Sequence, residues 1–245
     1  MDEKKFNKWF NLFIVVGMAL CVIASCVLKL PGEPRKWLLI LSTFGALMGV
    51  ASVVLSANGS IWTFVFGLVD VLIYSYILYD SKLPSQLALY VCYFIPMEFI
   101  GFYKWRKRGA DGKNQVKAQR LKGNKWVKYL LLYVVVYAAA LAVSYFVLHR
   151  GGEPFNWSKS VLDAAITTAN IVALVMMAGA YMEQWYLWTL VNLTAIVQWA
   201  ITLSTAPEAG YAIIPLIKYS FYLINGLNAI RIWRGLSAER NVAEA

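Results

Sequence analysis

The segment WVKYLLLYVVVYAAALAVSYFVL, residues 126–148, contains a single charged side chain, Lys128, in 23 positions. A helix needs about 20 apolar residues to cross the hydrocarbon core of a bilayer, so this run predicts a transmembrane helix. The rest of the chain has the same character. Of its 245 residues 60% are hydrophobic and 15% are charged, whereas a soluble domain carries about 25% charged residues. The sequence therefore predicts an all-α polytopic membrane protein.

Seven further apolar runs flank this segment and are separated by turn-forming or charged stretches. Pro31-Gly32-Glu33-Pro34, Asn58-Gly59 and Gly151-Gly152-Glu153-Pro154 are three of these breaks. The eight expected spans are residues 9–28, 36–56, 60–79, 84–104, 126–148, 159–182, 184–204 and 209–232.

The start of the chain has two interpretations. Lys4, Lys5 and Lys8 precede an apolar run that ends in Ile23-Ala24-Ser25-Cys26, a pattern that resembles a signal peptide. Because the run approaches the length of a full span, we interpret it as an uncleaved first helix.

Motifs for catalysis and cofactor binding are missing from the sequence. Cys21, Cys26 and Cys92 lie in apolar runs, and no group of Cys and His has the spacing of metal ligands. A Walker-type Gly-x-x-x-x-Gly-Lys-Ser/Thr run is also absent, so ATP hydrolysis by this chain is not expected. No cofactor is predicted. A membrane enzyme stays a rival interpretation, with Asp70 and Asp163 as acid–base candidates by chemistry alone.

Spans two to four resemble spans six to eight in their organisation. In each set, a helix with small residues precedes one that opens with tryptophan and one that ends in a basic and aromatic exit. The exits are Tyr103-Lys104-Trp105-Arg106 and Arg231-Ile232-Trp233-Arg234. Three spans are an odd number, so a second copy of three helices attached directly would be inverted in the membrane. The additional span at 126–148 crosses the membrane once more and makes the two triplets parallel. A parallel repeat is our interpretation, and chance similarity between apolar helices is the alternative.

This organisation predicts six parts of the chain. They are an extra N-terminal transmembrane helix at 1–30, a first three-helix repeat at 35–105, a basic cytoplasmic loop at 106–125, a linker helix at 126–150, a second three-helix repeat at 158–234 and a cytoplasmic tail at 235–245. The extra helix is expected to serve packing or oligomer contact.

The distribution of Lys and Arg orients the spans. Sixteen of the 23 basic residues lie on the side of the N-terminus and six on the other side. The positive-inside rule therefore predicts a cell (inner) membrane protein with both termini in the cytoplasm. The segment 106–125 could be taken for a nucleic-acid patch, but it lacks interleaved aromatics and joins two membrane helices. We expect it to contact anionic lipid headgroups, with no nucleic acid as partner.

The motif Trp185-x-x-Trp188-x-x-x-Asn192 places two indoles and an amide on one face of a membrane helix. At 100° per residue the three lie within about 60° of one another. An unpaired buried amide costs about 1–3 kcal/mol, so lipid gives no reason for an asparagine there. Two indoles beside an amide suit a flat, polar, aromatic molecule. The alternatives are an interfacial aromatic belt and an interhelical hydrogen bond.

Polar residues at helical spacing also mark neighbouring spans, and a lipid-facing stripe would not be so polar. These faces are therefore expected to line one cavity. Their members are Gln86, Tyr90 and Tyr93; Asp163, Thr167 and Asn170; Tyr181 and Trp199; and Tyr211, Lys218, Tyr222 and Asn225.

Charged residues within the spans are expected to pair with other polar or charged groups, because an unpaired charge in a membrane is costly. An unpaired Lys218 near the middle of its span would cost about 2.5–3.5 kcal/mol, and Asp70 is its possible counter-ion. Lys218 and Asp70 could form a structural ion pair, or they could contact the substrate or take part in proton coupling. Glu98, nearer the cytoplasmic end, is interpreted as a capping or snorkelling residue.

Three sequence features are expected to shape the helices. Gly45-x-x-x-Gly49 predicts close helix packing without ligand binding. Pro96 and Pro215 each remove a backbone hydrogen bond and favour a kink, which could be static or could serve as a hinge.

The tryptophan–asparagine motif, followed by Lys218-x-x-x-Tyr222-x-x-Asn225 on the last span, resembles the PnuC family of nicotinamide riboside transporters. The resemblance covers essentially the whole chain and is closest to bacterial members with an additional N-terminal helix. The first triplet matches less well, because Trp62 and Asp70 only loosely echo the second.

This resemblance implies a fold similar to SWEET sugar transporters, a homotrimer, and facilitated diffusion of nicotinamide riboside with trapping by a cytoplasmic kinase. It implies that Trp185, Trp188 and Asn192 contact the substrate. Thiamine or riboflavin as substrate, a proton-coupled carrier, and a receptor that binds without flux are the alternatives. Together with the polar faces, the candidate site consists of Asp70, Gln86, Tyr90, Asn170, Trp185, Trp188, Asn192, Lys218, Tyr222 and Asn225.

Overall fold

Every regular element in the described residues is helical, as the sequence predicts. The computed structural model describes residues 3–80, 84–150, 157–205 and 213–243. Its long helices are α1 (Glu3–Lys29), α2 (Lys36–Ala57), α3 (Trp62–Asp80), α6 (Asn124–Arg150), α7 (Trp157–Ala178), α8 (Gln184–Thr205) and α9 (Ile213–Ala243). The expected fourth span is divided into α4 (Pro84–Leu89), a π-helical segment (Tyr90–Phe94) and α5 (Ile95–Lys107).

All eight expected spans are present as helices. In the described part of the chain, five of them are long and apolar enough to cross a membrane by length and composition. Helices α7, α8 and α9 carry more polar residues, including Thr168, Asn192 and Asn225, which are buried. Polar side chains inside the protein avoid lipid, so they are compatible with a span. The largest extension beyond an expected span is at the end of α9, which continues to Ala243 through the segment expected to be a tail.

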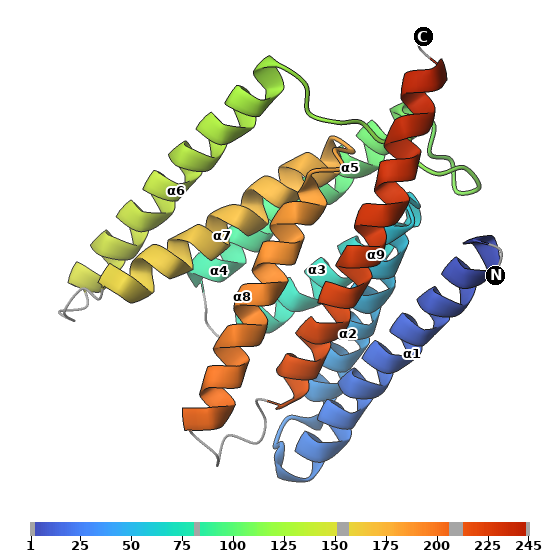
Figure 1. Cartoon of the computed structure of the whole chain (residues 1–245). Coiled ribbons are helices and arrows are strands. Elements are labelled where there is room, and N and C mark those ends of the chain that lie inside the picture. The colour runs from blue at the N-terminus through green and yellow to red at the C-terminus, as the bar shows by residue number, and fades with distance from the viewer. Residues whose placement is uncertain (1–2, 81–83, 151–156, 206–212, 244–245) are drawn as a thin grey trace.

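The helices form two similar groups of three. Helix α3 packs against both α2 and α5, and α8 packs against both α7 and α9. The groups touch through α2 with α9 and through α5 with α7, which is the reciprocal pattern of a two-fold relation. Helix α6 joins the groups and packs on α7 (Figure 1). The protein therefore consists of two parallel three-helix repeats joined by a linker helix, with α1 as an extra helix.

Two reciprocal hydrogen bonds tie the repeats together. The indole Nε1 of Trp105, near the end of α5, donates to the Met177 carbonyl of α7 at 2.7 Å. The indole Nε1 of Trp233 in α9 donates to the Ser56 carbonyl of α2 at 3.2 Å. Both tryptophans are fully buried, and their ring centroids lie 5.5 Å apart. The two basic and aromatic exits thus supply the packing between the repeats.

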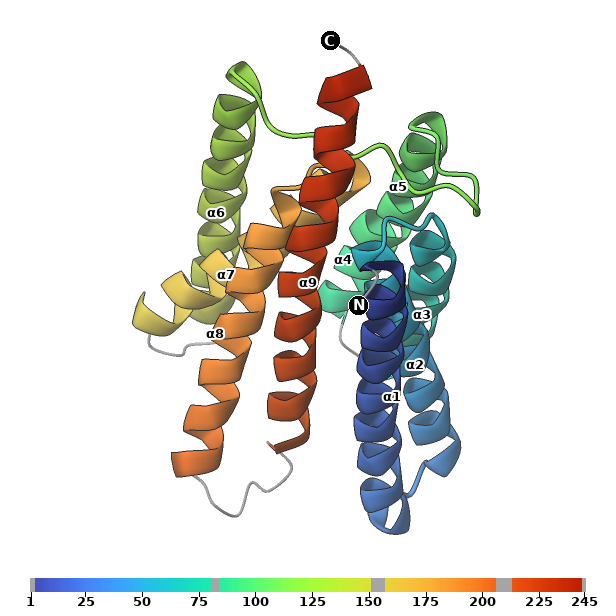
Figure 2. The same ribbon diagram turned by 45° about the vertical axis from the view of Figure 1, so that its right-hand side comes forward.

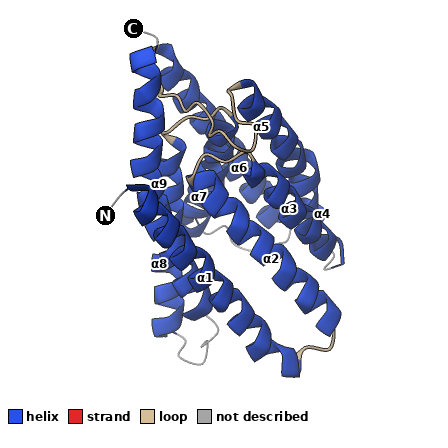
Figure 3. Cartoon of the chain, turned by 90° about the vertical axis from the view of Figure 1, so that its right-hand side faces the viewer, coloured by secondary structure: helices blue, strands red, loops and turns tan. Residues whose placement is uncertain are grey.

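Helix α1 lies alongside α2 and α9 (Figures 2 and 3). Ile14 and Met18 are fully buried in a cluster with Val50 and Val54 of α2. Gly17 permits close approach to α9, because a Cβ there would lie 2.4 Å from the Phe221 ring. The packing role expected for the extra helix matches these contacts.

The structure tests one of the two expected proline kinks. Pro96 cannot donate the hydrogen bond that would reach the Cys92 carbonyl, and the π-helical segment Tyr90–Phe94 ends two residues before this proline. The expected irregularity in the fourth span is therefore a π-helical turn. Pro215 lies in the first turn of the described part of α9, and the residues before Ile213 lie outside the described chain, so the kink expected there stays a prediction.

Candidate functional site

A cavity of about 570 Å³ lies between the two repeats. Ligand pockets for small molecules have volumes of roughly 300–1,000 Å³, so the space suits a metabolite of nucleoside size. Helices α2, α3, α5, α7, α8 and α9 and the π-helical segment all contribute to its wall. The lining residues that carry the argument are Gly49, Gly67, Asp70, Tyr90, Glu98, Asn170, Trp185, Trp188, Asn192, Gln198, Trp199, Tyr219 and Tyr222.

Helix α8 supplies an aromatic and amide wall. Trp185, Trp188 and Asn192 all line the cavity, as the helical spacing of the motif requires. Trp185 and Asn192 are 4% and 8% exposed, so neither side chain faces lipid. The indole Nε1 of Trp185 is buried and has no hydrogen-bond partner among the described residues. An unpaired buried donor beside a cavity is a group that a ligand could satisfy.

The first repeat supplies an acidic wall made by Asp70 of α3 and Glu98 of α5. Two glycines make room for these carboxyl groups. A Cβ at Gly49 would lie 2.6 Å from Asp70 Oδ2, and a Cβ at Gly67 would lie 2.9 Å from Glu98 Oε2. Within the described chain, neither carboxyl group forms a hydrogen bond or an ion pair. The cavity therefore joins two indoles and an amide with two carboxyl groups that are available to a ligand.

Two sequence interpretations need correction at this wall. Glu98 lines the cavity and does not cap or snorkel. The Gly45-x-x-x-Gly49 motif does bring α2 close to α3, since a Cβ at Gly45 would lie 2.9 Å from Ile73. However, Gly49 also lines the cavity beside Asp70, so the motif contributes to the site as well as to packing.

Lys218 and Asp70 do not form the ion pair that the sequence suggested. The Lys218 ammonium lies instead near the rings of Tyr219 and Tyr222, 5.6 and 5.4 Å from their centroids. A lysine within about 6 Å of an aromatic face gains a cation–π attraction, which reduces the cost of its place in the span. Both tyrosines line the cavity, whereas Lys218 itself does not reach its wall.

Other expected site residues have different positions. Asn225 is fully buried outside the cavity wall, and its amide reaches the Val53 carbonyl at 3.4 Å, so it holds α9 on α2. Tyr93 donates to the Ile171 carbonyl at 2.7 Å, and Tyr181 packs edge-on against Tyr129, with neither on the wall. Thr167 does not line the cavity either. The side chains of Gln86 and Asp163 and the whole of Tyr211 lie outside the described residues.

The cavity thus brings together Asp70, Tyr90, Asn170, Trp185, Trp188, Asn192 and Tyr222 from the candidate list. Reasoning from sequence missed Glu98, Gln198 and Tyr219 as wall residues. Glu98 could have been identified as a wall residue from the sequence, because it is an acidic residue inside an apolar span. In the described residues, no group of His, Cys, Asp and Glu is arranged to hold a metal ion.

Known proteins resemble this chain along nearly its whole length. A family model described as nicotinamide mononucleotide transporter matches residues 39–235. A Neisseria mucosa protein named nicotinamide riboside transporter PnuC is 32% identical over 210 residues, which cover 83% of this chain and 74% of that protein. A Haemophilus influenzae protein of the same name is 29% identical over 241 residues, which cover 98% of this chain and 97% of that one.

A solved structure has the same architecture. It is described as the crystal structure of the vitamin B3 transporter PnuC and superposes with a TM-score of 0.62. It is 29% identical to this chain and covers 93% of it, and the match covers 92% of that structure's chain. The likeness therefore includes α1 as well as both repeats.

Proposed function

The chain belongs to the nicotinamide mononucleotide transporter family, and we propose that it carries nicotinamide riboside through the cavity between its repeats. It is a multi-pass membrane transporter and not an enzyme. The observation that carries the choice of substrate is the α8 wall, where two indoles and an amide meet in one cavity. Relatives named for nicotinamide riboside transport support the same choice.

The chemistry of nicotinamide riboside fits both walls. Its pyridinium ring is flat and positively charged, so an indole face attracts it by about 2 kcal/mol when water is excluded. Its carboxamide both donates and accepts hydrogen bonds, as does the Asn192 amide. Asp70 and Glu98 place two carboxyl groups on the side of the first repeat, and an ionised Asp70 would attract the cationic ring. Thiamine also carries a cationic ring, so it is the stronger competitor of the two alternative vitamins.

We infer facilitated diffusion with alternating access as the mode of transport. The sequence holds no Walker-type nucleotide motif, so ATP hydrolysis would not drive this chain. A facilitator only equilibrates its substrate, and a cytoplasmic kinase that phosphorylates nicotinamide riboside would make uptake unidirectional. A proton-coupled carrier is the second candidate, and the two unpaired carboxyl groups in the cavity are the observation that favours it.

The proposed setting follows the charge distribution and the family. We propose a homotrimer in the cell (inner) membrane, surrounded by the lipid bilayer, with both termini in the cytoplasm. We also propose that the six parts expected from the sequence are the functional units of the chain. They are the extra helix (1–30), the first repeat (35–105), the basic loop (106–125), the linker helix (126–150), the second repeat (158–234) and the tail (235–245).

Uptake of labelled nicotinamide riboside into liposomes that contain only this protein tests the function. We expect uptake that saturates and that unlabelled nicotinamide riboside inhibits more strongly than thiamine or riboflavin. Trp188→Ala and Asn192→Ala should each weaken binding at least tenfold, about 1.4 kcal/mol. Leu193→Ala, on the exposed face of the same helix, is the matched control and should bind normally. Normal binding by the Trp188→Ala, Asn192→Ala double variant would refute this placement of the site.

A clamped membrane potential separates facilitation from proton coupling. The substrate is itself a cation, so an uncoupler alone would change its driving force in either case. With the potential held at zero by potassium and valinomycin, a facilitator shows no accumulation when a pH gradient is imposed. Accumulation under those conditions, lost in Asp70→Asn, would establish the proton-coupled carrier.

A further inference from the structure

The basic segment between α5 and α6 is packed more closely against the protein than a solvated or lipid-facing loop would be. Figure 2 shows it crossing the end of the bundle at which α9 finishes, which is the predicted cytoplasmic end. Val116, Ala118 and Leu121 are buried, whereas Lys117, Arg120 and Lys122 are exposed. The apolar side chains of this segment therefore face the protein, and its basic side chains face outward. We call residues 115–122 the strap.

Before the strap, the chain makes a tight exposed turn. The Asp111 carboxylate accepts hydrogen bonds from the backbone N–H groups of Asn114 at 2.8 Å and Lys113 at 3.1 Å. These bonds hold the pKa of Asp111 below its usual range. The turn therefore returns the chain toward the bundle, where the strap begins.

The strap binds the backbone of the corner between α2 and α3. The Val116 N–H donates to the Gly59 carbonyl at 2.9 Å, and Gln115 Nε2 donates to the Asn58 carbonyl at 2.9 Å. Gly59 has a φ of +66°, a left-handed conformation that suits glycine and turns the chain sharply. One backbone bond and one glutamine side chain thus hold this corner.

The strap binds the corresponding corner between α7 and α8 in the same way. The Gln119 N–H donates to the Ala180 carbonyl at 2.9 Å, and Gln119 Nε2 donates to the Gly179 carbonyl at 2.7 Å. The Gln119 carbonyl also accepts the Met182 N–H at 2.9 Å. Ala180 repeats the left-handed conformation of Gly59 with a φ of +56°. Two glutamines four residues apart therefore hold equivalent corners of the two repeats.

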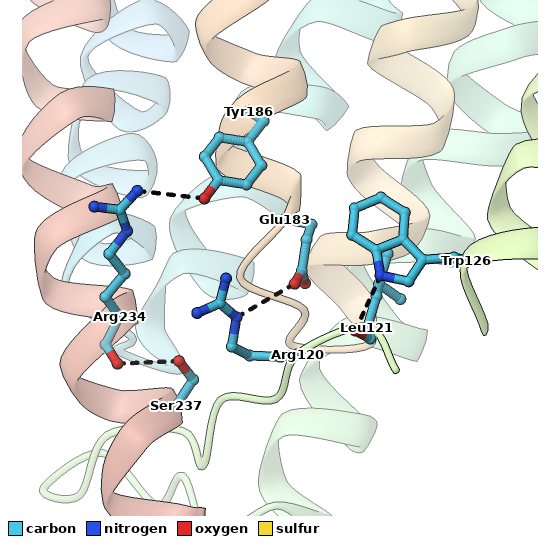
Figure 4. A network of polar contacts seen from close by, with 7 residues as sticks. All are labelled: Arg120, Leu121, Trp126, Glu183, Tyr186, Arg234 and Ser237. Atoms are coloured by element: carbon cyan, nitrogen blue, oxygen red, sulfur yellow. Dashed lines mark hydrogen bonds and ion pairs between the residues drawn. The ribbon is translucent and has the colours of Figure 1, made fainter. Parts of the chain in front are cut away.

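An ion pair adds to the second corner. Arg120 Nε lies 3.5 Å from Glu183 Oε1, and the Glu183 side chain is 4% exposed (Figure 4). Arg120 therefore provides a counter-ion from the strap for the buried Glu183 carboxylate. Figure 4 also shows Trp126, at the start of α6, donating to the Leu121 carbonyl at 3.1 Å. The strap is thereby attached at its end as well as along its length.

The second corner leads directly into the aromatic wall of the cavity. The Trp185 N–H bonds to the Met182 carbonyl, and Met182 in turn bonds to Gln119. The first corner leads instead to Trp62, which is 50% exposed and lies outside the cavity; the only wall residue at this corner among those described is Ser56, at the end of α2, and it supplies no aromatic surface. The two glutamine bonds are thus equivalent in structure but differ in what they position.

We propose that the strap joins the two repeats at the cytoplasmic end and that Gln119 is a positioning residue for Trp185. The consequence for transport rests on the proposed function of the cavity. Gln119 does not touch the substrate; it fixes the corner from which Trp185 projects. Gln115 holds the other repeat and has no such effect on the binding wall.

Calorimetric binding of nicotinamide riboside to matched variants tests this role. Gln119→Ala should raise the Kd by about two- to thirteenfold at most, the range that corresponds to one lost buried hydrogen bond. Gln119→Glu keeps the shape but cannot donate to the Gly179 carbonyl, so it should weaken binding at least as much. Gln115→Ala loses the equivalent bond of the first repeat and should leave the Kd within about twofold. In the liposome assay Gln119→Ala should raise KM while the maximal rate stays near that of the wild type.

A double-variant cycle distinguishes positioning from general destabilisation. If Gln119 acts through Trp185, adding Gln119→Ala to Trp185→Ala should not weaken binding further. Equal effects of Gln115→Ala and Gln119→Ala, or additive effects in the cycle, would overturn the proposal.

Hydrogen exchange of the amides in residues 179–186 reads the corner without any substrate. Gln119→Ala should speed this exchange and Gln115→Ala should not. If the wild type binds no nicotinamide riboside, the proposed function fails, and the exchange result alone decides the role of the strap. Unchanged exchange in Gln119→Ala would refute that role.

Discussion

Replacing Trp185 by phenylalanine separates the hydrogen bond of this side chain from its packing. The same substitution at Trp105 and Trp233 provides two internal comparisons. All three indoles are buried, and the three rings are neighbours, with centroids 5.5 Å apart for Trp105 and Trp233 and 6.1 Å apart for Trp185 and Trp233. Only the N–H of Trp185 lacks a partner in the described structure.

The structure sets the size of the expected differences. Trp105→Phe loses the 2.7 Å bond to the Met177 carbonyl, which still accepts the Ala180 N–H and so is not left unpaired. The loss is therefore the net value of one buried hydrogen bond, about 0.5–1.5 kcal/mol, beyond the smaller ring that all three variants share. Trp233→Phe should lose a similar amount. Trp185→Phe loses no bond in the unliganded protein and should be the most stable of the three.

Binding should show the opposite order. If a substrate acceptor satisfies the Trp185 N–H, Trp185→Phe forfeits about 0.5–1.5 kcal/mol of binding free energy, a rise in Kd of about two- to thirteenfold. The phenylalanine ring keeps most of the stacking surface, so binding is weakened and not abolished. Trp105→Phe and Trp233→Phe should leave the Kd of the folded protein near that of the wild type.

Thermal unfolding in detergent and titration calorimetry with nicotinamide riboside measure both quantities on the same samples. We expect Tm to fall by several degrees more in Trp105→Phe and Trp233→Phe than in Trp185→Phe. The reasoning is refuted if Trp185→Phe binds as tightly as the wild type, or if it loses as much stability as the other two.

Three further changes follow from the same structure. Asp70→Asn removes a negative charge from the cavity, which is worth about 1–2 kcal/mol at separations of roughly 8–16 Å and an effective dielectric constant near 20. Calorimetry should show a Kd about five- to thirtyfold higher for nicotinamide riboside but not for its uncharged dihydro form, and equal losses for both would exclude charge recognition. Gln184→Met replaces a fully buried amide without hydrogen-bond partners in the described chain and should raise Tm, since an unsatisfied buried amide costs about 1–3 kcal/mol; a lower Tm would mean that the amide has a partner after all. Gly101→Ala would place a Cβ 2.1 Å from the buried Phe64 ring and should destabilise the protein by about 1–3 kcal/mol, whereas Gly235→Ala, with open space around it, is the control that should not.

Local patterns were enough to predict the helices and most of one wall of the cavity. A helix has a fixed period, so the spacing of Trp185, Trp188 and Asn192 decides that they share a face before any packing is known. The length of each apolar run decides that it can span a bilayer. The parallel repeat could be inferred in the same way, because an odd number of spans plus one linker helix leaves little choice of direction.

The sequence was a poor guide wherever the partner came from another helix. Glu98 and Asn225 both occur inside apolar spans, and nothing in their spacing indicates that the first faces the cavity while the second reaches the Val53 carbonyl of α2. The basic composition of residues 106–125 predicted contact with lipid headgroups. The backbone hydrogen bonds of the strap are independent of side-chain charge, so composition could not reveal them.

Periodicity and length are properties of a single segment, and they fix which residues of a helix share a face and how far the helix reaches. The choice of neighbour for that face depends on how six helices close around one cavity, and on where Gly49 and Gly67 allow carboxyl groups to approach. Sequence alone therefore determined a two-repeat membrane transporter with an aromatic and amide face on α8. Only the tertiary structure set acidic residues in the wall of the same cavity and placed the strap across both corners, because both depend on distances between residues far apart in the chain.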